Sequence, residues 1–131
     1  MYRHTLRSRY SETDKMGYVY YGRYLEYFEE ARTEMIRSLG FPYSRMEKEG
    51  VLLPVTEAAL DYHAPVHYDE PMTIEVLIYQ VPTVRLITWY RLYTERRSDP
   101  HVSGRVSLVF VNAVSRRPVR PPVSFTTPFD S

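Results

Sequence analysis

The order of apolar and polar residues divides the start of the chain into two segments with different periods. Residues 2–10 alternate with a period of two, which is typical of a β-strand. From about Gly22 the apolar positions recur every three or four residues instead. These positions are Tyr24, Phe28, Ala31, Met35 and Leu39. The pattern predicts an amphipathic helix of about 17 residues, ended by Gly40 and Pro42, with one apolar face toward a core.

The remainder of the chain has the character of strands. Apolar or alternating segments cover residues 51–62, 72–81, 84–95 and 104–112. Turn-like segments at 81–83 and 96–103 separate the last three, so we expect antiparallel hairpins there. A polar connector at 44–50 precedes the first of these strands. The tail, 115–131, is rich in proline and has no periodicity, and we expect it to be extended rather than helical.

This order of elements, a strand, one long helix and then four strands, favours the α+β class with an antiparallel sheet packed on the helix. No repeat or linker interrupts the chain, so we expect residues 1–131 to form a single domain with 115–131 as an extended tail. No segment approaches the roughly 20 apolar residues of a membrane helix. No secretory signal follows Met1, and we expect a cytoplasmic protein without membrane contact. The sequence has no cysteine, which excludes a disulfide or a cysteine nucleophile.

Charge is balanced in total but not along the chain. The 17 Lys and Arg residues face 16 Asp and Glu residues, a ratio too even for a general nucleic-acid binder. Residues 1–84 hold 9 basic and 13 acidic side chains, whereas residues 85–131 hold 8 basic and 3 acidic ones. The second half is either a solvated surface or the part of the chain that meets an anion.

The best candidate for chemistry is the loop that leads into the long helix. Glu12 and Asp14 lie on this loop, and the first turn of a helix offers unpaired backbone N–H groups. A carboxylate beside a carbonyl polarised by such groups is a minimal apparatus for acyl transfer. The same two carboxylates could instead only cap the loop and the helix. The four histidines show no metal-ligand spacing, so we expect neither a metal nor a cofactor.

The same loop and helix carry a family motif. An Asp, a Gly and a Val precede a helix with the pattern Tyr-Leu-x-Tyr-Phe-Glu-x-Ala-Arg, matched here by Asp14, Gly17, Val19 and residues 24–32. A second block agrees, with Leu53-Pro54-Val55 followed by Asp61, Tyr62, Pro65 and Asp69. Over residues 3–112 the chain therefore resembles the 4-hydroxybenzoyl-CoA thioesterase family. The resemblance implies a hotdog fold, in which a curved antiparallel sheet wraps around one long central α-helix.

The resemblance also assigns roles to residues. Asp14 falls on the catalytic aspartate, which acts as nucleophile or as the base that activates water. Tyr21 falls where a backbone N–H binds the thioester oxygen, and Glu12 is at most a helper. Two motif residues, Gly17 and Tyr24, are assigned to substrate binding. The predicted coenzyme A contacts are arginines, namely Arg85, Arg116, Arg117 and Arg120. Arg23 departs from the family pattern and could meet a carboxylate or a phosphate, or point to solvent.

The leading hypothesis is an acyl-CoA thioesterase that releases a free carboxylic acid and coenzyme A. Hotdog subunits join their sheets and place each active site at the two-fold interface, so we expect a homodimer or homotetramer. A non-catalytic hotdog module that binds acyl-CoA or serves as a scaffold is one alternative. A hydratase or dehydratase on the same fold is another, although no histidine occurs between Glu12 and Arg32.

Overall fold

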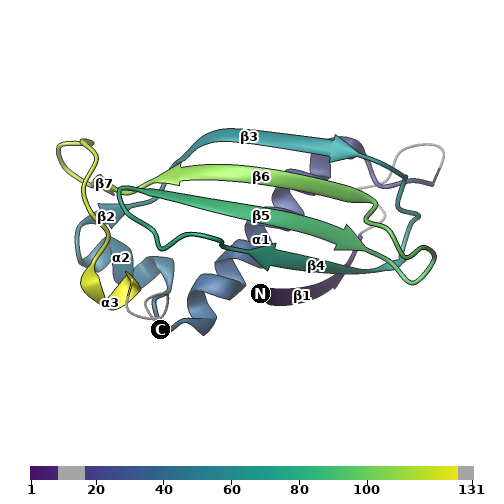
Figure 1. Ribbon diagram of the computed structural model, residues 1–131, viewed down its shortest axis with the longest axis horizontal. Helices are drawn as coiled ribbons and strands as arrows, with labels where there is room; N and C mark the ends of the chain where they lie inside the picture. Colours follow the sequence, from purple (N-terminus) through teal and green to yellow (C-terminus); the bar gives the residue numbers. More distant parts are fainter. Residues whose placement is uncertain (9–16, 127–131) are drawn as a thin grey trace.

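The computed structural model describes residues 1–8 and 17–126 and is built on a five-stranded antiparallel sheet. The strand order is β1-β4-β5-β6-β3. The strands are β1 (Tyr2–Arg7), β4 (Pro71–Leu77), β5 (Arg85–Tyr93), β6 (Val102–Val109) and β3 (Val55–Tyr62). One long helix, α1 (Tyr24–Ser38), crosses a single face of this sheet (Figure 1). The predicted α+β class and hotdog fold are confirmed.

The core lies between α1 and the sheet, and the periods of both elements explain why. Alternate residues of β4 and β5 are buried, and α1 buries one continuous stripe. The stripe consists of Tyr24, Tyr27, Phe28, Ala31, Arg32, Met35 and Ile36. At its centre the ring of Phe28 stacks on Tyr90 of β5, with centroids 4.6 Å apart and planes 10° apart. A Cβ atom on Gly104 of β6 would lie 3.0 Å from the Phe28 ring and 2.5 Å from Leu60, so the helix packs this closely because that position is glycine.

Two of the predicted strands are each interrupted. The segment 51–62 divides into β2 (Val51–Leu52) and β3, and the segment 104–112 divides into β6 and β7 (Val111–Asn112). Strands β2 and β7 pair with each other as a separate two-stranded sheet. The division between β2 and β3 falls at Pro54, which has no N–H to donate to a neighbouring strand. Its carbonyl still accepts the Val109 N–H at 3.1 Å, so the two sheets remain joined.

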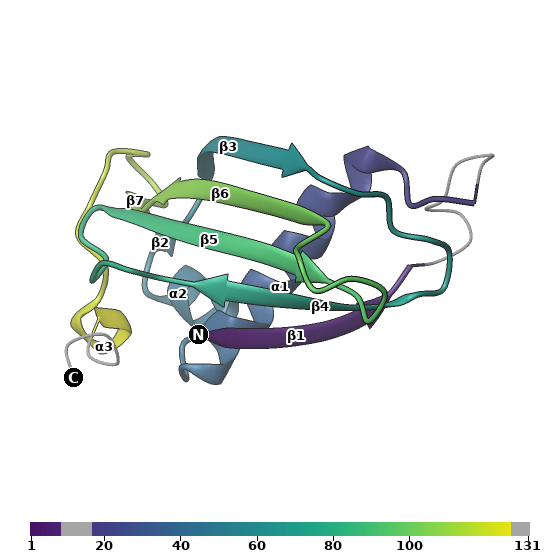
Figure 2. The ribbon, with the colours of Figure 1, turned by 45° about the vertical axis from the view of Figure 1, so that its right-hand side comes forward.

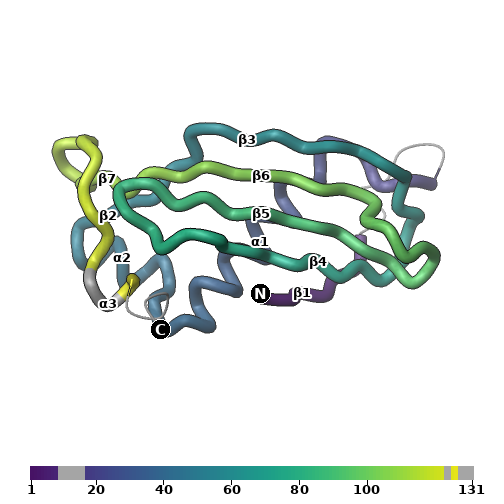
Figure 3. Tube along the Cα trace, viewed as in Figure 1, coloured from purple at the N-terminus to yellow at the C-terminus, as the bar shows by residue number. Residues whose placement is uncertain are grey.

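Two short helices correct the prediction of irregular segments. Helix α2 (Tyr43–Lys48) occupies the expected polar connector, and α3 (Val123–Thr126) lies in the tail that was expected to contain no helix. A buried apolar side chain holds each of them, Met46 in α2 and Phe125 in α3. Phe125 packs edge-on against Phe41 and Phe110. One or two turns are too short to show a helical period, so tertiary packing decides these segments. Figure 3 shows the chain after β7 passing along the end of the sheet to α3.

Strand β3 is an uncovered edge of the sheet. Figure 2 shows it at the end of the strand order, bonded to β6 on one side. Seven of its eight residues are exposed, including Val55 (50%) and Tyr62 (51%) at its two ends. An open edge with exposed apolar residues is a surface that proteins normally cover. Among the described residues, no helix is long and apolar enough to cross a membrane.

Candidate active site

The end of the predicted catalytic loop is fixed by the segment at 63–70. The Gly17 carbonyl accepts the Tyr68 N–H at 2.8 Å, and the Val19 N–H donates to the Val66 carbonyl at 2.8 Å. Gly17 has a φ of 80°, a value that favours glycine. The chain therefore has a defined path from residue 17 onward. Asp14 and Glu12 lie outside the described residues, and their roles stay predictions.

Tyr21 stands at the first turn of the long helix. A 3₁₀ turn, η2 (Tyr21–Arg23), runs directly into α1, and the Arg23 N–H donates to the Tyr20 carbonyl at 2.9 Å. The N–H of Tyr21 belongs to the first turn, whose donors have no acceptor within the helix. The side chain of Tyr20, the residue before this turn, makes no capping hydrogen bond. The side chain of Tyr24 is only 2% exposed, so the start of the helix is packed against the core.

A cavity of about 310 Å³ opens at this helix start. Its lining comes from the helix entrance, the end of β3 and the following loop, namely Tyr18, Val19, Tyr21, Tyr24, Tyr62, His63, Ala64 and Pro65. The Tyr62 hydroxyl donates to the Tyr21 carbonyl at 3.4 Å. Apolar walls with a few polar groups are typical of small-molecule sites. The predicted residues Tyr21 and Tyr24 therefore meet at one cavity beside Gly17, and Tyr62 and His63 join them. The motif block at 61–69 was the sequence signal for Tyr62, whereas His63 occupies an unspecified position of that block.

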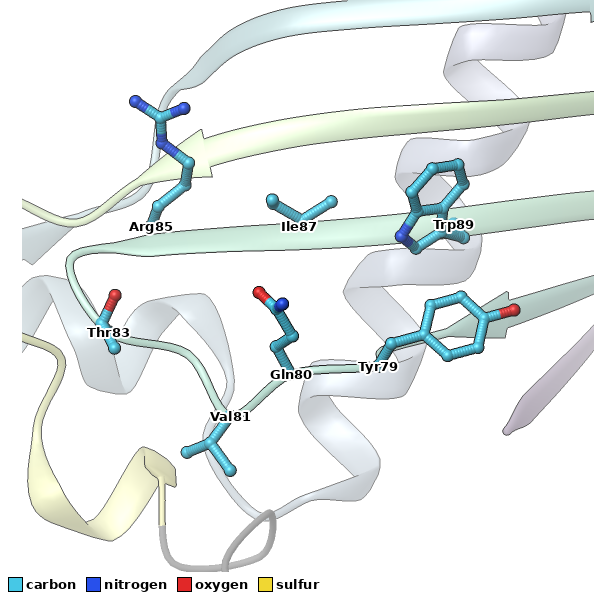
Figure 4. Close-up of a pocket in the computed structure, with 7 residues that line it drawn as sticks. All are labelled: Tyr79, Gln80, Val81, Thr83, Arg85, Ile87 and Trp89. Atoms are coloured by element: carbon cyan, nitrogen blue, oxygen red, sulfur yellow. The ribbon is translucent and has the colours of Figure 1, made fainter.

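The predicted coenzyme A arginines lie elsewhere in the same chain. Arg85 pairs with Val109 at the opposite end of the sheet from Tyr62. It lines a groove of about 420 Å³ on the face away from α1, and Figure 4 shows its guanidinium at the far end of that groove from Tyr79 and Trp89.

Arg116, Arg117 and Arg120 are exposed and follow β7, which pairs with β2 at the start of β3. Strand β3 alone spans about 26 Å at ~3.3 Å per residue, so one protomer does not bring these arginines to Tyr21. Arg23 forms an ion pair with Glu26 on its own helix, at 2.9 Å.

A polar cluster of Arg96, Glu70 and His67 holds the segment at 63–70. The guanidinium of Arg96 donates to Glu70 from Nε at 2.9 Å and from Nη2, and it also contacts the His67 ring. The His67 ring in turn packs against Tyr18, with centroids 5.0 Å apart. Partial burial alone raises the pKa of Glu70, but hydrogen bonds from Arg96 and from the His67 backbone outweigh it and lower that pKa. This arrangement ties Arg96 to the end of the predicted catalytic loop.

His101 is buried in its neutral form next to this cluster, which predicts a pH dependence of stability. Its Nδ1 lies 3.0 Å from the Pro65 carbonyl, an acceptor, so Nδ1 carries the proton and Nε2 accepts the Thr94 hydroxyl at 2.7 Å. Burial lowers the His101 pKa below its usual 6.5. As the pH falls below 6.5, the unfolded chain takes up a proton that the folded chain excludes. Stability should then decline by at most about 1.4 kcal/mol per pH unit, the slope for one proton.

The measurement for His101 is denaturant unfolding of the wild-type protein and of His101→Asn at several pH values between 5 and 8. The wild type is expected to lose stability more steeply than the variant on the acid side. Equal slopes in the two proteins would show that His101 does not couple folding to pH.

Comparison with known proteins identifies the family. Residues 8–129 match the family model described as the thioesterase-like superfamily. The chain belongs to this superfamily. It is 36% identical over 112 residues to the protein YneP of Bacillus subtilis, covering 86% of this chain and 80% of YneP. The acyl-CoA thioester hydrolase YbgC of Escherichia coli is 27% identical over 129 residues, covering 98% of this chain and 96% of YbgC.

A solved structure agrees with this placement in the thioesterase-like superfamily. The DHNA-CoA thioesterase of Staphylococcus aureus superposes with a TM-score of 0.84 at 31% identity, covering 91% of this chain and 79% of that one. The assignment of this chain to an enzyme family of thioesterases is thereby confirmed. Its narrower placement among 4-hydroxybenzoyl-CoA thioesterases stays a prediction.

Proposed function

We propose that this protein hydrolyses the thioester bond of an acyl-CoA to a carboxylic acid and coenzyme A. The observation that carries the proposal is the cavity at the start of α1, where Tyr21, a residue of the first turn, lies among aromatic walls beside Gly17. Asp14 lies three residues before Gly17. Membership of the thioesterase-like superfamily supports the same reaction.

In this proposal the Tyr21 N–H polarises the carbonyl oxygen of the thioester, because a backbone donor at a helix start favours the negative charge that develops there. The Asp14 carboxylate then acts in one of two ways. It takes a proton from water so that the oxygen of that water attacks the carbonyl carbon, or it attacks that carbon itself. In both routes the C–S bond breaks and the sulfur leaves as a thiolate, which takes up a proton. In the second route water then cleaves the acyl-enzyme anhydride.

A homodimer formed through β3 would complete the site. Antiparallel pairing of β3 with its copy, around an axis between Ala58 and Ala59, places Val55 of one protomer opposite the partner's Tyr62. The end of the sheet that lies near the predicted coenzyme A arginines in one protomer then adjoins the start of α1 in the other. The dimer thus brings these arginines closer to a Tyr21 than they are within one protomer. Light scattering should give about 31 kDa for a dimer, or about 62 kDa for a tetramer, from a chain of 15.6 kDa. A mass of one chain would contradict this arrangement.

The experiment that tests the activity is a panel of short, long and aromatic acyl-CoA esters with detection of the free thiol. Release of coenzyme A from at least one ester, dependent on Asp14, supports the hydrolase. Tight binding of acyl-CoA without thiol release would favour the non-catalytic hotdog module instead.

The cluster around Arg96 yields a prediction for catalysis. Arg96→Gln removes the charged contacts that hold Glu70 and His67 behind Tyr18, so the catalytic loop should be less well placed. We expect kcat to fall about 3- to 10-fold with KM changed less than twofold, since small misplacements act on the chemical step. The melting temperature should move little, because the pair is partly exposed and such pairs contribute about 0–1 kcal/mol.

The matched control is Arg91→Gln, which breaks a similar partly exposed pair with Glu75 on the strand face. Its kcat should equal that of the wild type. If both variants lose kcat equally, or if Arg96→Gln loses only stability, the cluster has no positioning role.

A further inference from the structure

A second cavity lies on the helix side of the sheet, beside the middle of α1, where Glu29 and Arg32 line it. Its volume is about 430 Å³, and it is an open cavity lined by α1, α2 and the segment around β2. Met46, Val51, Leu53 and Pro54 make its walls largely apolar. It is distinct from the cavity at the helix start, with which it shares no residue. Its size suits an acyl chain of moderate length.

A buried cation lines this cavity. Arg32 projects from the apolar stripe of α1 and is only 5% exposed. Its Nε donates to the Tyr43 hydroxyl at 3.2 Å, and its Nη1 donates to the Tyr90 hydroxyl at 3.0 Å. Burial alone lowers the pKa of Arg32, but the two phenol oxygens outweigh it and raise that pKa above its usual value. The guanidinium is therefore charged, and two neutral groups fix its orientation.

Among the described residues, Arg32 lacks the opposite charge with which a buried charge is normally paired. Within residues 1–8 and 17–126 it forms no ion pair, and its Nη2 makes no hydrogen bond. The Nη2 atom nevertheless keeps some contact with solvent, since it is not one of the fully buried polar atoms that lack a hydrogen bond. Because Arg32 lines the cavity, the remaining exposure of its guanidinium opens into that cavity. Buried charges are usually paired with an opposite charge, and a guanidinium fits a carboxylate especially well.

We propose that this cavity binds a carboxylate at the far end of the acyl chain, so that the substrates are acyl-CoA thioesters of dicarboxylic acids. This inference rests on the proposed function and on the dimer through β3. In that dimer the Leu53–Val55 rim of one protomer adjoins the partner's helix start, so an acyl group held there can extend inward toward Arg32. The rim itself carries Glu29, Glu47 and Arg116. These charges of mixed sign lie near solvent, whereas Arg32 acts at the floor, where water screens it less.

The test uses pairs of substrates that differ only in the terminal carboxylate: butanoyl- and succinyl-CoA, hexanoyl- and adipoyl-CoA, and octanoyl- and suberoyl-CoA. For at least one pair, the wild type should hydrolyse the diacid thioester with a kcat/KM at least tenfold higher. Arg32→Met should remove this preference while the activity on the matching monoacid thioester stays within about threefold. Arg37→Met, an exposed arginine of the same helix, should retain the preference.

A wild type without any preference for a diacid overturns the inference, and so does an Arg32→Met variant that loses both activities equally. In the second case Arg32 only supports the core. Because that variant removes a buried group and could fail to fold, binding is also measured with Asp14→Asn. Its Kd for the preferred diacid thioester should be at least tenfold lower than for the monoacid, and equal Kd values overturn the inference whether or not the wild type hydrolyses either ester. Absence of thiol release from every ester instead refutes the proposed hydrolase.

Discussion

Replacing Asp14 with asparagine is expected to lower kcat/KM for acyl-CoA hydrolysis by about 10²- to 10⁴-fold, the range for loss of a general base. Asparagine keeps the size of the side chain, so the fold and the binding of acyl-CoA should persist. It cannot accept a proton from water at neutral pH, and its amide is a poor nucleophile. The effect should therefore appear in kcat rather than in KM. Steady-state kinetics with thiol detection on the best ester of the panel measures it.

Glu12→Gln is the matched control for Asp14→Asn, because it removes a carboxylate from the same loop two residues earlier. As a helper at most, Glu12 should account for less than about tenfold in kcat/KM, well below the range for a general base. An unchanged kcat/KM in Asp14→Asn would reject the assigned chemistry. If Glu12→Gln had the larger effect, the roles of the two carboxylates would be reversed.

The long helix and its inner face could be predicted because they depend on local periodicity. The spacing of Tyr24, Phe28, Ala31 and Met35 is the spacing of the buried stripe of α1. Arg32 is the exception, because the sequence around a charged residue in an apolar stripe does not show which groups will contact its guanidinium. Its phenol partners come from Tyr43, eleven residues later, and from Tyr90 on β5. Only the folded chain brings these groups together.

The pairing of β3 is the step that sequence pattern could not supply. Adjacent segments suggested hairpins, and β4-β5 and β5-β6 are indeed neighbours. Strand β3, however, pairs with β6 rather than with β4, and this choice is made by long-range packing. It places Tyr62 beside Tyr21 and the predicted arginines at the far end of the sheet. The sequence therefore predicted that Tyr21 and Tyr24 would share a cavity, but not that this cavity and the arginines would lie at opposite ends of the sheet.

The largest expected effect on stability comes from Phe28→Ala. Phe28 is fully buried, stacks on Tyr90 and touches the surface that Gly104 leaves open. Truncation removes the ring and leaves a cavity between α1 and the sheet. Such a change should lower the free energy of unfolding by about 3–5 kcal/mol, a large share of the roughly 5–15 kcal/mol typical of a domain.

Denaturant unfolding measures the effect of Phe28→Ala, with a lower midpoint and an unchanged m-value expected. Leu25→Ala is the control on the same helix, because Leu25 is 43% exposed and lies outside the buried stripe. Its cost should stay below about 1 kcal/mol, near the range for surface substitutions. A loss of less than about 1 kcal/mol for Phe28→Ala would mean that the helix-to-sheet contact relaxes around the missing ring. The stack of Phe28 on Tyr90 would then not be the centre of the core.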